Sequence, residues 1–280
     1  MSLLYASNDW YPVADAACLA RGPRKTRLLG TDLEVLGPFD DPVVTDMGGR
    51  RFPVQVRYDH LWTTIGDDPR PLFDIPEADE PGRRHVPCGV VRVKCSPLRA
   101  VENFLDIAHF PFVHTGILGV EPHTEVATYK AEIREDADEV WATNISFYQP
   151  QAAKSAAGGI TTRYEYRVPA PTAAVLYKTC PPRPKAMDVI AIFAQPRSET
   201  DCDVWPWMAL YDDTTGFADL AQFQQEIFLQ DRSILENQRP VKLPLDPKLE
   251  IPTRADLTSI AYRRWLKRRG AYYGALTDQT

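Results

Sequence analysis

The segment from Val126 to Leu210 constrains the fold more than any other part of the sequence. It contains runs in which apolar residues alternate with polar or small ones, a pattern typical of antiparallel β-strands. The runs are EVWATNISFYQ, TTRYEYRV, AAVLYKTC, DVIAIFAQP and VWPWMALY. A strongly helical stretch, ADLAQFQQEIFLQDRSILENQ, follows them, and another helix is expected near the C-terminal end. We therefore expect an α+β fold in which helices cover an antiparallel sheet.

The first seventy residues have a different pattern. Short strand-like runs, TRLLGTDLEVLG, RFPVQVRYD and HLWTTIGD, are broken there by Gly, Pro and Asp, which indicates an all-β piece. A Pro-rich connection, DDPRPLFDIPEADEPG, leads into a second region that opens with the expected strand CGVVRVKC. We place the boundary between the two regions at residue 70.

The composition is that of a globular protein large enough to bury a substantial core. Of the 280 residues, 44% are hydrophobic and 25% are charged. The net charge of −6 argues against nucleic acid as the main partner, because phosphate-binding surfaces need concentrated basic charge. The N-terminal residues contain no basic region followed by a long apolar run. We therefore expect no signal peptide, no membrane span and a location in the cytoplasm.

Cysteines and one basic cluster carry two further expectations. An odd number of cysteines at irregular spacing argues against a disulfide framework and for reduced, mostly buried thiols. We interpret the basic cluster YRRWLKRR as the solvated face of a terminal helix; a docking surface for an acidic electron carrier is the alternative. The cysteines are Cys18, Cys88, Cys95, Cys180 and Cys202.

The most informative motif is ENFLDIAHFPFVH, which places four polar residues within twelve positions: Asn103, Asp106, His109 and His114. Two imidazoles can ligate a first-row metal, but residues five apart are separated by about 140° around a straight helix. We predict a helix that is capped by Ser96 and ended by Pro111 just after His109, so that His114 returns on a loop. Histidines that merely form hydrogen bonds at a helix end are the alternative.

A third ligand candidate, Asp231, lies on the helix predicted after the sheet. On a wheel of about 100° per residue, Asp231 shares one face of this helix with largely apolar residues, whereas Glu226 and Glu236 point elsewhere. An inward carboxylate needs a compensating cation. Two histidines and one aspartate match the ligand set of non-haem Fe(II) oxygenases; pairing with a buried arginine is the alternative. The face contains Phe223, Ile227, Asp231, Ile234 and Gln238.

These motifs resemble those of the Rieske-type ring-hydroxylating oxygenases. ENFLDIAHFPFVH is similar to their iron-binding motif, and FLQDRSILENQRP is similar to the helix that brings their third ligand. NDWYPVA and YDHLWTTIGDDP are similar to segments that flank their cluster domain. The resemblance implies a catalytic domain over residues 71–280 with a helix-grip-like antiparallel sheet and covering helices. It also implies that residues 1–70 are a truncated all-β remnant of a Rieske domain.

The same resemblance implies roles for individual residues. His109, His114 and Asp231 would hold the iron. Asp106 would link this iron to a neighbouring Rieske histidine, and Asn103 would have a structural or outer-shell role. A second set rests on the predicted helix, where residues one or two turns from Asp231 are candidates for the substrate pocket, the last of them able to bond a purine edge. These are Ile227, Leu235 and Gln238.

The sequence departs from the family at the cluster itself. A Rieske [2Fe-2S] cluster needs one cysteine with a histidine two residues later and another with a histidine three residues later. None of the five cysteines has a histidine at either position, and PFDDPVVTDMGGRRFP forms a short linker where the family has its cluster loops. The sequence also has no G-x-G-x-x-G fingerprint or P-loop. We therefore expect no cluster in this chain and electrons from another polypeptide.

Within the family, the arrangement resembles the methylxanthine N-demethylase subunits of bacterial caffeine degradation. That resemblance implies a monooxygenase that converts 7-methylxanthine to xanthine and formaldehyde. It also implies a Rieske-containing reductase as electron donor and a related demethylase subunit as a partner in a hetero-oligomer. An inactive paralogue that acts as a scaffold is the alternative function, and a carrier that binds a small molecule without iron is a third.

Overall fold

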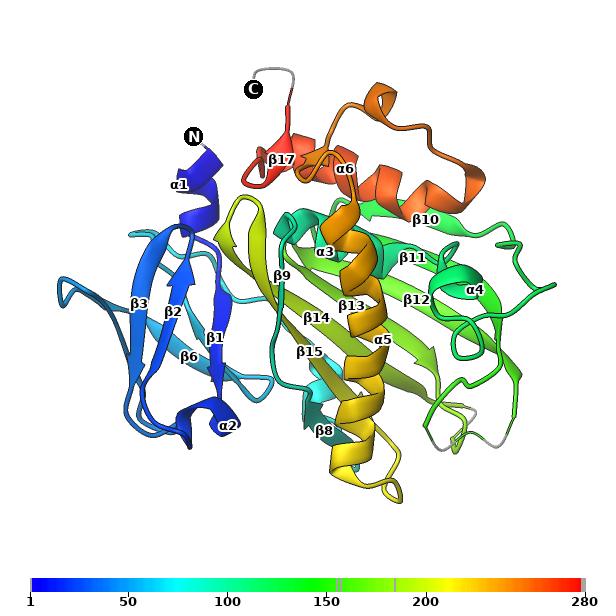
Figure 1. Cartoon of the computed structure of the whole chain (residues 1–280), viewed down its shortest axis with the longest axis horizontal. Helices are drawn as coiled ribbons and strands as arrows, with labels where there is room; N and C mark the ends of the chain where they lie inside the picture. Colours follow the sequence, from blue (N-terminus) through cyan, green and yellow to red (C-terminus); the bar gives the residue numbers. More distant parts are fainter. Residues whose placement is uncertain (1, 155, 157, 184, 278–280) are drawn as a thin grey trace.

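The computed structural model describes residues 2–154, 156, 158–183 and 185–277. Its main element is an eight-stranded antiparallel sheet in the order β10-β11-β12-β13-β14-β15-β8, in which β9 also pairs with β15 (Figure 1). The expected α+β fold with an antiparallel sheet is confirmed. The strands are β8 (Arg84–Pro87), β9 (Val91–Val93), β10 (Lys130–Arg134), β11 (Glu139–Gln149), β12 (Ile160–Ala170), β13 (Ala173–Thr179), β14 (Met187–Ser198) and β15 (Asp201–Leu210).

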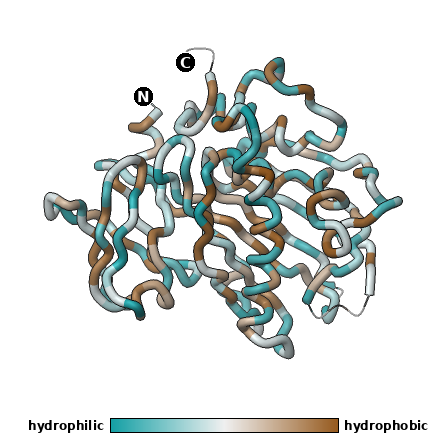
Figure 2. The backbone as a smooth tube through the Cα atoms, in the orientation of Figure 1, coloured by the Kyte–Doolittle hydropathy of each residue, from teal (hydrophilic) through white to brown (hydrophobic). Residues whose placement is uncertain are grey.

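The central strands of this sheet are buried on both faces. Successive side chains of a strand point to opposite sides, and in β13 Leu176 faces one hydrophobic core while Val175 and Tyr177 face the other. In the same way, Val204 and Trp205 of β15 belong to different cores. The hydropathy of the residues agrees with this arrangement, since many apolar segments lie in the middle of the molecule (Figure 2). Both faces of the sheet are therefore covered.

Helices cover one face. Helix α3 (Pro97–Leu105), helix α5 (Phe217–Asn237) and helix α6 (Leu257–Arg269) pack against the sheet, and α5 crosses it along its length (Figure 1). The oxygen of Ser96 caps α3 by accepting from the backbone N–H of Leu98 at 3.1 Å, as predicted. Smaller elements complete this side: α4 (Phe110–Val113), η2 (Pro247–Leu249), η3 (Arg254–Asp256), β16 (Leu243–Pro244) and β17 (Ala275–Leu276). The short helix η1 (Pro76–Asp79) lies on the opposite face, where Ala78 packs against the other core.

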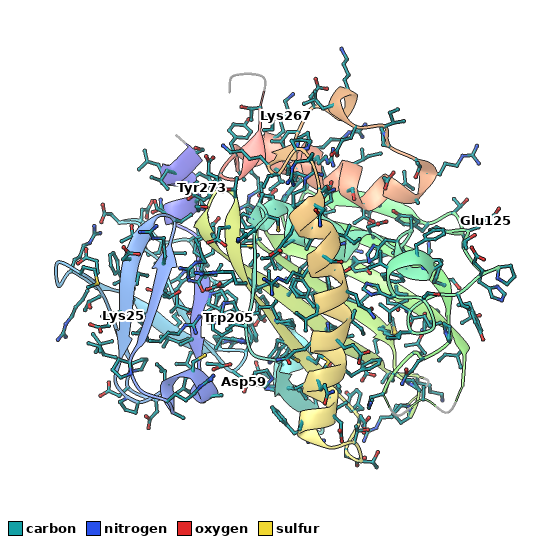
Figure 3. The ribbon with its side chains drawn as sticks, in the orientation of Figure 1. Lys25, Asp59, Glu125, Trp205, Lys267 and Tyr273 are labelled. Carbon is teal, nitrogen blue, oxygen red and sulfur yellow. The ribbon has the colours of Figure 1, made fainter. Side chains whose placement is uncertain are left out.

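The N-terminal residues cover the other face. They form a three-stranded sheet, β1-β7-β6, and a four-stranded sheet, β2-β3-β4-β5. Their aromatic side chains pack directly on the large sheet, for example Trp62 on Phe193 with ring centroids 4.9 Å apart, and Trp205 lies between the two parts (Figure 3). The elements are α1 (Ser2–Ser7), β1 (Tyr11–Asp15), α2 (Ala16–Leu19), β2 (Arg24–Leu28), β3 (Thr31–Leu36), β4 (Val43–Asp46), β5 (Arg51–Phe52), β6 (Val54–Arg57) and β7 (His60–Thr63).

Two predictions about these strands need correction. The segment interpreted as a short linker contains strand β4, which pairs with β3 because Val44 contributes a fully buried side chain to the core. The strand expected over CGVVRVKC is limited to β9, because Gly89 adopts a positive φ of 74° and separates β9 from β8. The boundary at residue 70 stays a prediction, since one core contains side chains from both sides of it.

The expectation that most cysteines are buried is confirmed. All five cysteines are buried and free. No helix in the described ranges is long and apolar enough to cross a membrane.

Candidate metal centre

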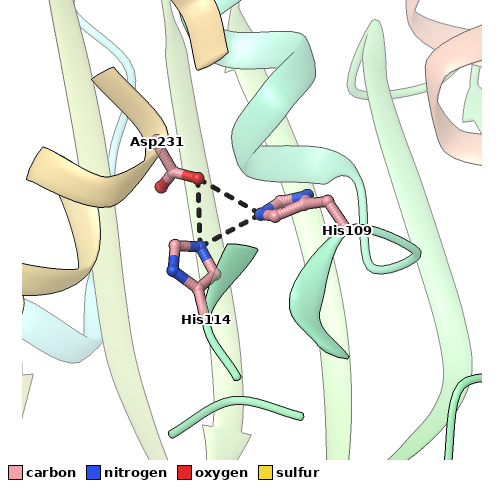
Figure 4. Close-up of side chains that lie close together, drawn as sticks. All are labelled: His109, His114 and Asp231. Atoms are coloured by element: carbon pink, nitrogen blue, oxygen red, sulfur yellow. Dashed lines mark hydrogen bonds and ion pairs between the residues drawn. The ribbon is translucent and has the colours of Figure 1, made fainter. Parts of the chain in front are cut away.

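Three side chains meet in the interior between the helices and the sheet. Nε2 of His109 lies 3.1 Å from Nε2 of His114, and Oδ1 of Asp231 lies 3.2 Å and 3.0 Å from these two nitrogens (Figure 4). The side chain of His114 is 1% exposed, and those of His109 and Asp231 are 13% and 10% exposed. The sequence-predicted triad is therefore assembled in space, from residues more than a hundred positions apart.

Nδ1 of each imidazole, the nitrogen that points away from Asp231, donates a hydrogen bond to a side-chain oxygen. Nδ1 of His109 donates to Oδ2 of Asp106 at 2.9 Å, and Nδ1 of His114 donates to Oε1 of Gln230 at 2.7 Å. In a neutral imidazole with a protonated Nδ1, the lone pair is on Nε2. When both imidazoles are neutral, both lone pairs point toward the oxygen of Asp231, and a cation bound between the three atoms would compensate them.

Electrostatics in this cluster favour positive charge. Burial alone would lower the pKa of His109, but its hydrogen bonds to Asp106 and Asp231 outweigh burial and raise the pKa to about 9. Burial would raise the pKa of Asp231, but the two neighbouring imidazoles outweigh it and hold that pKa below its usual range. The site thus stabilises a cation and an ionised carboxylate together.

The local path of the chain between the histidines differs from the prediction. Helix α3 ends at Leu105, not after His109, because Asp106 is extended and its Oδ1 accepts from the backbone N–H of Ala108 at 2.9 Å. His109 is then the N-cap of the short helix α4, and His114 is its C-cap. Pro111 lies in the first turn of α4, where it needs no N–H partner, instead of ending α3.

Close packing fixes this short helix. The ring of Phe110 packs edge-on against Phe147 with centroids 5.9 Å apart. A Cβ added to Gly119 would lie 2.6 Å from the backbone nitrogen of Pro111, so only glycine allows the following loop to approach so closely. Packing against the protein core therefore fixes the positions of the two histidines that flank α4.

Asp231 lies on the buried face of α5, as the helical wheel predicted. Ile227 is buried on the same face, but Ile234 is 48% exposed, and Leu235 replaces it in the core. Gln238 is outside the helix as its C-cap. The buried face is thus rotated by about one residue from the predicted one near the C-terminal end of α5.

The three side chains line a narrow cavity of about 90 Å³. Of the predicted pocket residues, Ile227 lines this cavity, Gln238 lines the neighbouring one, and Leu235 lines neither. Among the polar residues that sequence reasoning missed is Gln224, which lies two turns before Asp231, is 7% exposed and makes no side-chain hydrogen bond with the described residues. Apolar side chains dominate the rest: Phe104, Phe110, Leu118, Tyr164, Tyr166, Leu176, Ile190, Met208, Leu220, Phe223 and Phe228.

A second, larger cavity of about 560 Å³ lies on the other side of His109. Asp106 lines only this second cavity, whereas Asn103 lines both. Arg264 and Lys267 of α6 line it too, and Lys267 lies at the surface of this helix (Figure 3). This second cavity, which we call the outer cavity, therefore leads to the carboxylate of Asp106, the group that accepts a hydrogen bond from His109.

The basic cluster on α6 is only partly a solvated face. Arg263 is largely buried and pairs with Glu102 at 2.6 Å, because α6 packs on α3 at this point. Arg268 and Arg269 pair with Asp138. The interpretation as a solvated face is therefore wrong for Arg263.

Comparisons with known proteins place this chain in a family. Residues 93–271 match the family described as vanillate O-demethylase oxygenase C-terminal domain. The chain is 43% identical over 273 residues to a probable methylxanthine N7-demethylase, NdmC, of Pseudomonas sp. (strain TJI-51), and the match covers 96% of each protein. It is 24% identical to the methylxanthine N1-demethylase NdmA of Pseudomonas putida, covering 78% of this chain and 60% of that protein.

Solved structures share the fold. The structure of Pseudomonas putida CBB5 NdmA with caffeine superimposes with a TM-score of 0.77 at 20% identity, covering 98% of this chain and 96% of that one. Dicamba monooxygenase bound to 3,6-dichlorosalicylic acid superimposes with a TM-score of 0.73 at 15% identity, covering 94% and 97%.

Proposed function

This chain belongs to the Rieske-type non-haem iron oxygenases, and from that membership we propose that it is an N-demethylase that removes the N7-methyl group of 7-methylxanthine. The 43% identity to a probable methylxanthine N7-demethylase over nearly the whole chain supports this substrate. The iron would be held by His109, His114 and Asp231, and the electrons would come from a Rieske cluster on a partner protein.

One observation carries the proposal: the donor set fits Fe(II). Two imidazole Nε2 atoms and one carboxylate oxygen lie within 4.8 Å of one another, and hydrogen bonds to Asp106 and Gln230 aim both imidazoles at one point. Two histidines and one carboxylate leave further coordination positions open, as oxygen-activating iron enzymes require. A structural site would instead be closed by protein ligands.

The reaction needs dioxygen and two electrons. Bound Fe(II) would supply the redox chemistry that activates dioxygen. One oxygen atom enters a C–H bond of the N-methyl group, and the other leaves as water after taking up two electrons and two protons. The resulting carbinolamine releases formaldehyde and leaves the proton on the ring nitrogen. The protein has to orient the methyl group and exclude water, and no separate catalytic base is required.

The cavity suits a small planar substrate. Its walls are mostly aromatic and aliphatic, so a flat heterocycle would be buried against rings such as those of Phe104 and Tyr166. The amide of Gln224 offers one donor and one acceptor to the polar edge of the heterocycle. In this proposal Gln224 has the role that the sequence assigned to Gln238.

Electron delivery in trans rests on the sequence and on the outer cavity. None of the five cysteines has a histidine two or three residues later, so we propose that this chain has no cluster of its own. Asp106 connects the outer cavity to His109 by a hydrogen bond, which offers a route from a docked cluster to the iron. A Rieske-containing reductase would dock there, and a related demethylase subunit would complete a hetero-oligomer in the cytoplasm.

Reconstitution tests the proposal. The purified chain, loaded with Fe(II) without oxygen, should bind about one iron per chain. It should release formaldehyde and xanthine from 7-methylxanthine only when a reductase with a Rieske cluster is added. Turnover with a reductase that carries no cluster would contradict electron delivery in trans, and no turnover with either reductase would contradict the proposed activity.

The second candidate is a catalytically inactive subunit that stabilises an active oxygenase. The lack of a cysteine with a histidine two or three residues later favours it, because a partner would then supply the cluster. It predicts that Asp231→Ala has no effect on product formation by a mixed oligomer. Under the first proposal, the same variant abolishes the N7-demethylation due to this chain.

A further inference from the structure

A buried lysine lines the same cavity as the triad. Lys178 lies on β13, between Tyr164 of β12 and Asp188 of β14 in the sheet register. It is 6% exposed and lies on the helix-covered side, where Leu176 of the same strand belongs to the core around the triad. Of the two lysines that line the cavity, Lys178 is buried and Lys154 is exposed.

The contacts of Lys178 leave hydrogen-bonding capacity unused. Its ammonium donates to the carbonyl of Ala152, but an ammonium has three N–H donors. Within the described ranges no ion pair within 4.0 Å involves Lys178, and the carboxylate of Asp188 accepts instead from the backbone N–H of Tyr211 at 3.1 Å. A buried charge with unused donors destabilises a protein unless an acceptor arrives. The cavity is where such an acceptor can enter.

We propose that Lys178 determines substrate specificity by donating a hydrogen bond to a ring carbonyl oxygen of a planar heteroaromatic substrate. This inference rests on the proposed function and adds the chemistry that recognises the substrate. An apolar cavity with a few fixed polar groups orients its ligand through those groups. The carbonyl would lie at Lys178 while the methyl group to be hydroxylated faces the triad.

The other role open to Lys178 is purely structural. Its bond to Ala152 would then only fasten the segment after β11 beside the cavity. The two roles differ in what they demand of the ligand. A structural lysine does not distinguish a ligand that has ring carbonyls from one that lacks them.

Equilibrium binding tests the proposal without requiring turnover. We would titrate the purified chain by calorimetry with 7-methylxanthine, which has two ring carbonyls, and with 7-methylpurine, which has none. The wild type should bind 7-methylxanthine at least about tenfold more tightly, as a charged hydrogen bond predicts. In Lys178→Met this preference should fall to about threefold or less. In Lys25→Met, which changes an exposed lysine of β2 outside the cavity, it should equal that of the wild type.

Several outcomes would overturn the proposal. Equal binding of both ligands by the wild type overturns it without any variant, so a poorly folded Lys178→Met does not prevent the test. An unchanged preference in a folded Lys178→Met also overturns it, and if formaldehyde release persists, the proposed function survives. If the wild type binds neither ligand and releases no formaldehyde, both proposals are wrong.

Discussion

Nδ1 of His114 donates a hydrogen bond to Oε1 of Gln230 at 2.7 Å, and Gln230 directly precedes Asp231 on α5. One turn of helix therefore carries both a candidate ligand and the group that orients another ligand. Asp106 has the equivalent function for His109. Each histidine is thus aimed by a side chain that does not itself belong to the triad.

Replacing Gln230 should weaken iron binding without unfolding the protein. In Gln230→Leu the imidazole of His114 loses its acceptor, and we expect the Fe(II) affinity to fall about 10-fold to 100-fold. An anaerobic titration with a competing chelator measures this. Gln222→Leu changes an exposed glutamine on the same helix and should retain the wild-type affinity. Equal affinities of the two variants would contradict an orienting role for Gln230.

Removing the carboxylate should have a larger effect. Asp231→Ala leaves two imidazoles and no anionic ligand, so we expect the iron content to fall from about one per chain to near zero, together with turnover. Glu226→Ala removes an exposed carboxylate from the same helix and is the matched control. Elemental analysis after anaerobic loading measures the iron content of both variants. Retained iron in Asp231→Ala would place the third ligand elsewhere.

Asp106 should affect electron delivery more than substrate binding. In Asp106→Asn only one side-chain oxygen remains for the bonds to His109 and Ala108, whereas the native carboxylate uses two. We expect turnover with the Rieske partner to fall at least about tenfold, as seen when such supporting contacts are removed. The affinity for 7-methylxanthine should stay within about twofold, because Asp106 does not line the cavity next to the triad. A parallel loss of ligand affinity would contradict this division.

Alternation and length made most of the fold predictable from the sequence. The runs of β11 and β12 alternate, those of β13 to β15 are rich in apolar residues over seven to twelve positions, and α5 is long enough for its period to be clear. Short elements were missed. Strand β4 contains only four residues, and its pairing depends on a core that is distant in sequence. Length therefore decided which elements the pattern revealed.

The site was predictable where residue type alone defined it. His109, His114 and Asp231 come together as expected. The break between α3 and α4 was not predictable, because it depends on the turn made by Asp106 and on the contact between Gly119 and Pro111. Near the end of α5 the buried face is rotated by about one residue from the predicted one, so Leu235 and Gln238 do not line the cavity next to the triad.

The pH dependence of stability should reveal the buried lysine. Burial lowers the pKa of Lys178 from its ordinary value of 10.5 to about 8, against the opposing effect of Asp188. Asp188 and Tyr164 are the ionisable neighbours in adjacent strands, and burial raises the pKa of Tyr164, which stays neutral. Between about pH 8 and pH 10, the unfolded chain therefore binds more protons at Lys178 than the folded chain does, so this group's contribution to the free energy of unfolding rises with pH.

Lys178→Met should lack this increase of the free energy of unfolding with pH. We expect the free energy of unfolding of the wild type, relative to that of Lys178→Met, to increase between about pH 7.5 and pH 9.5, because the folded lysine becomes neutral in this range while the unfolded one stays charged. Urea titrations of both proteins at several pH values measure the difference. Lys154→Met should follow the wild type, since its lysine is exposed. A difference that is constant with pH would mean that Lys178 keeps its charge in the folded protein.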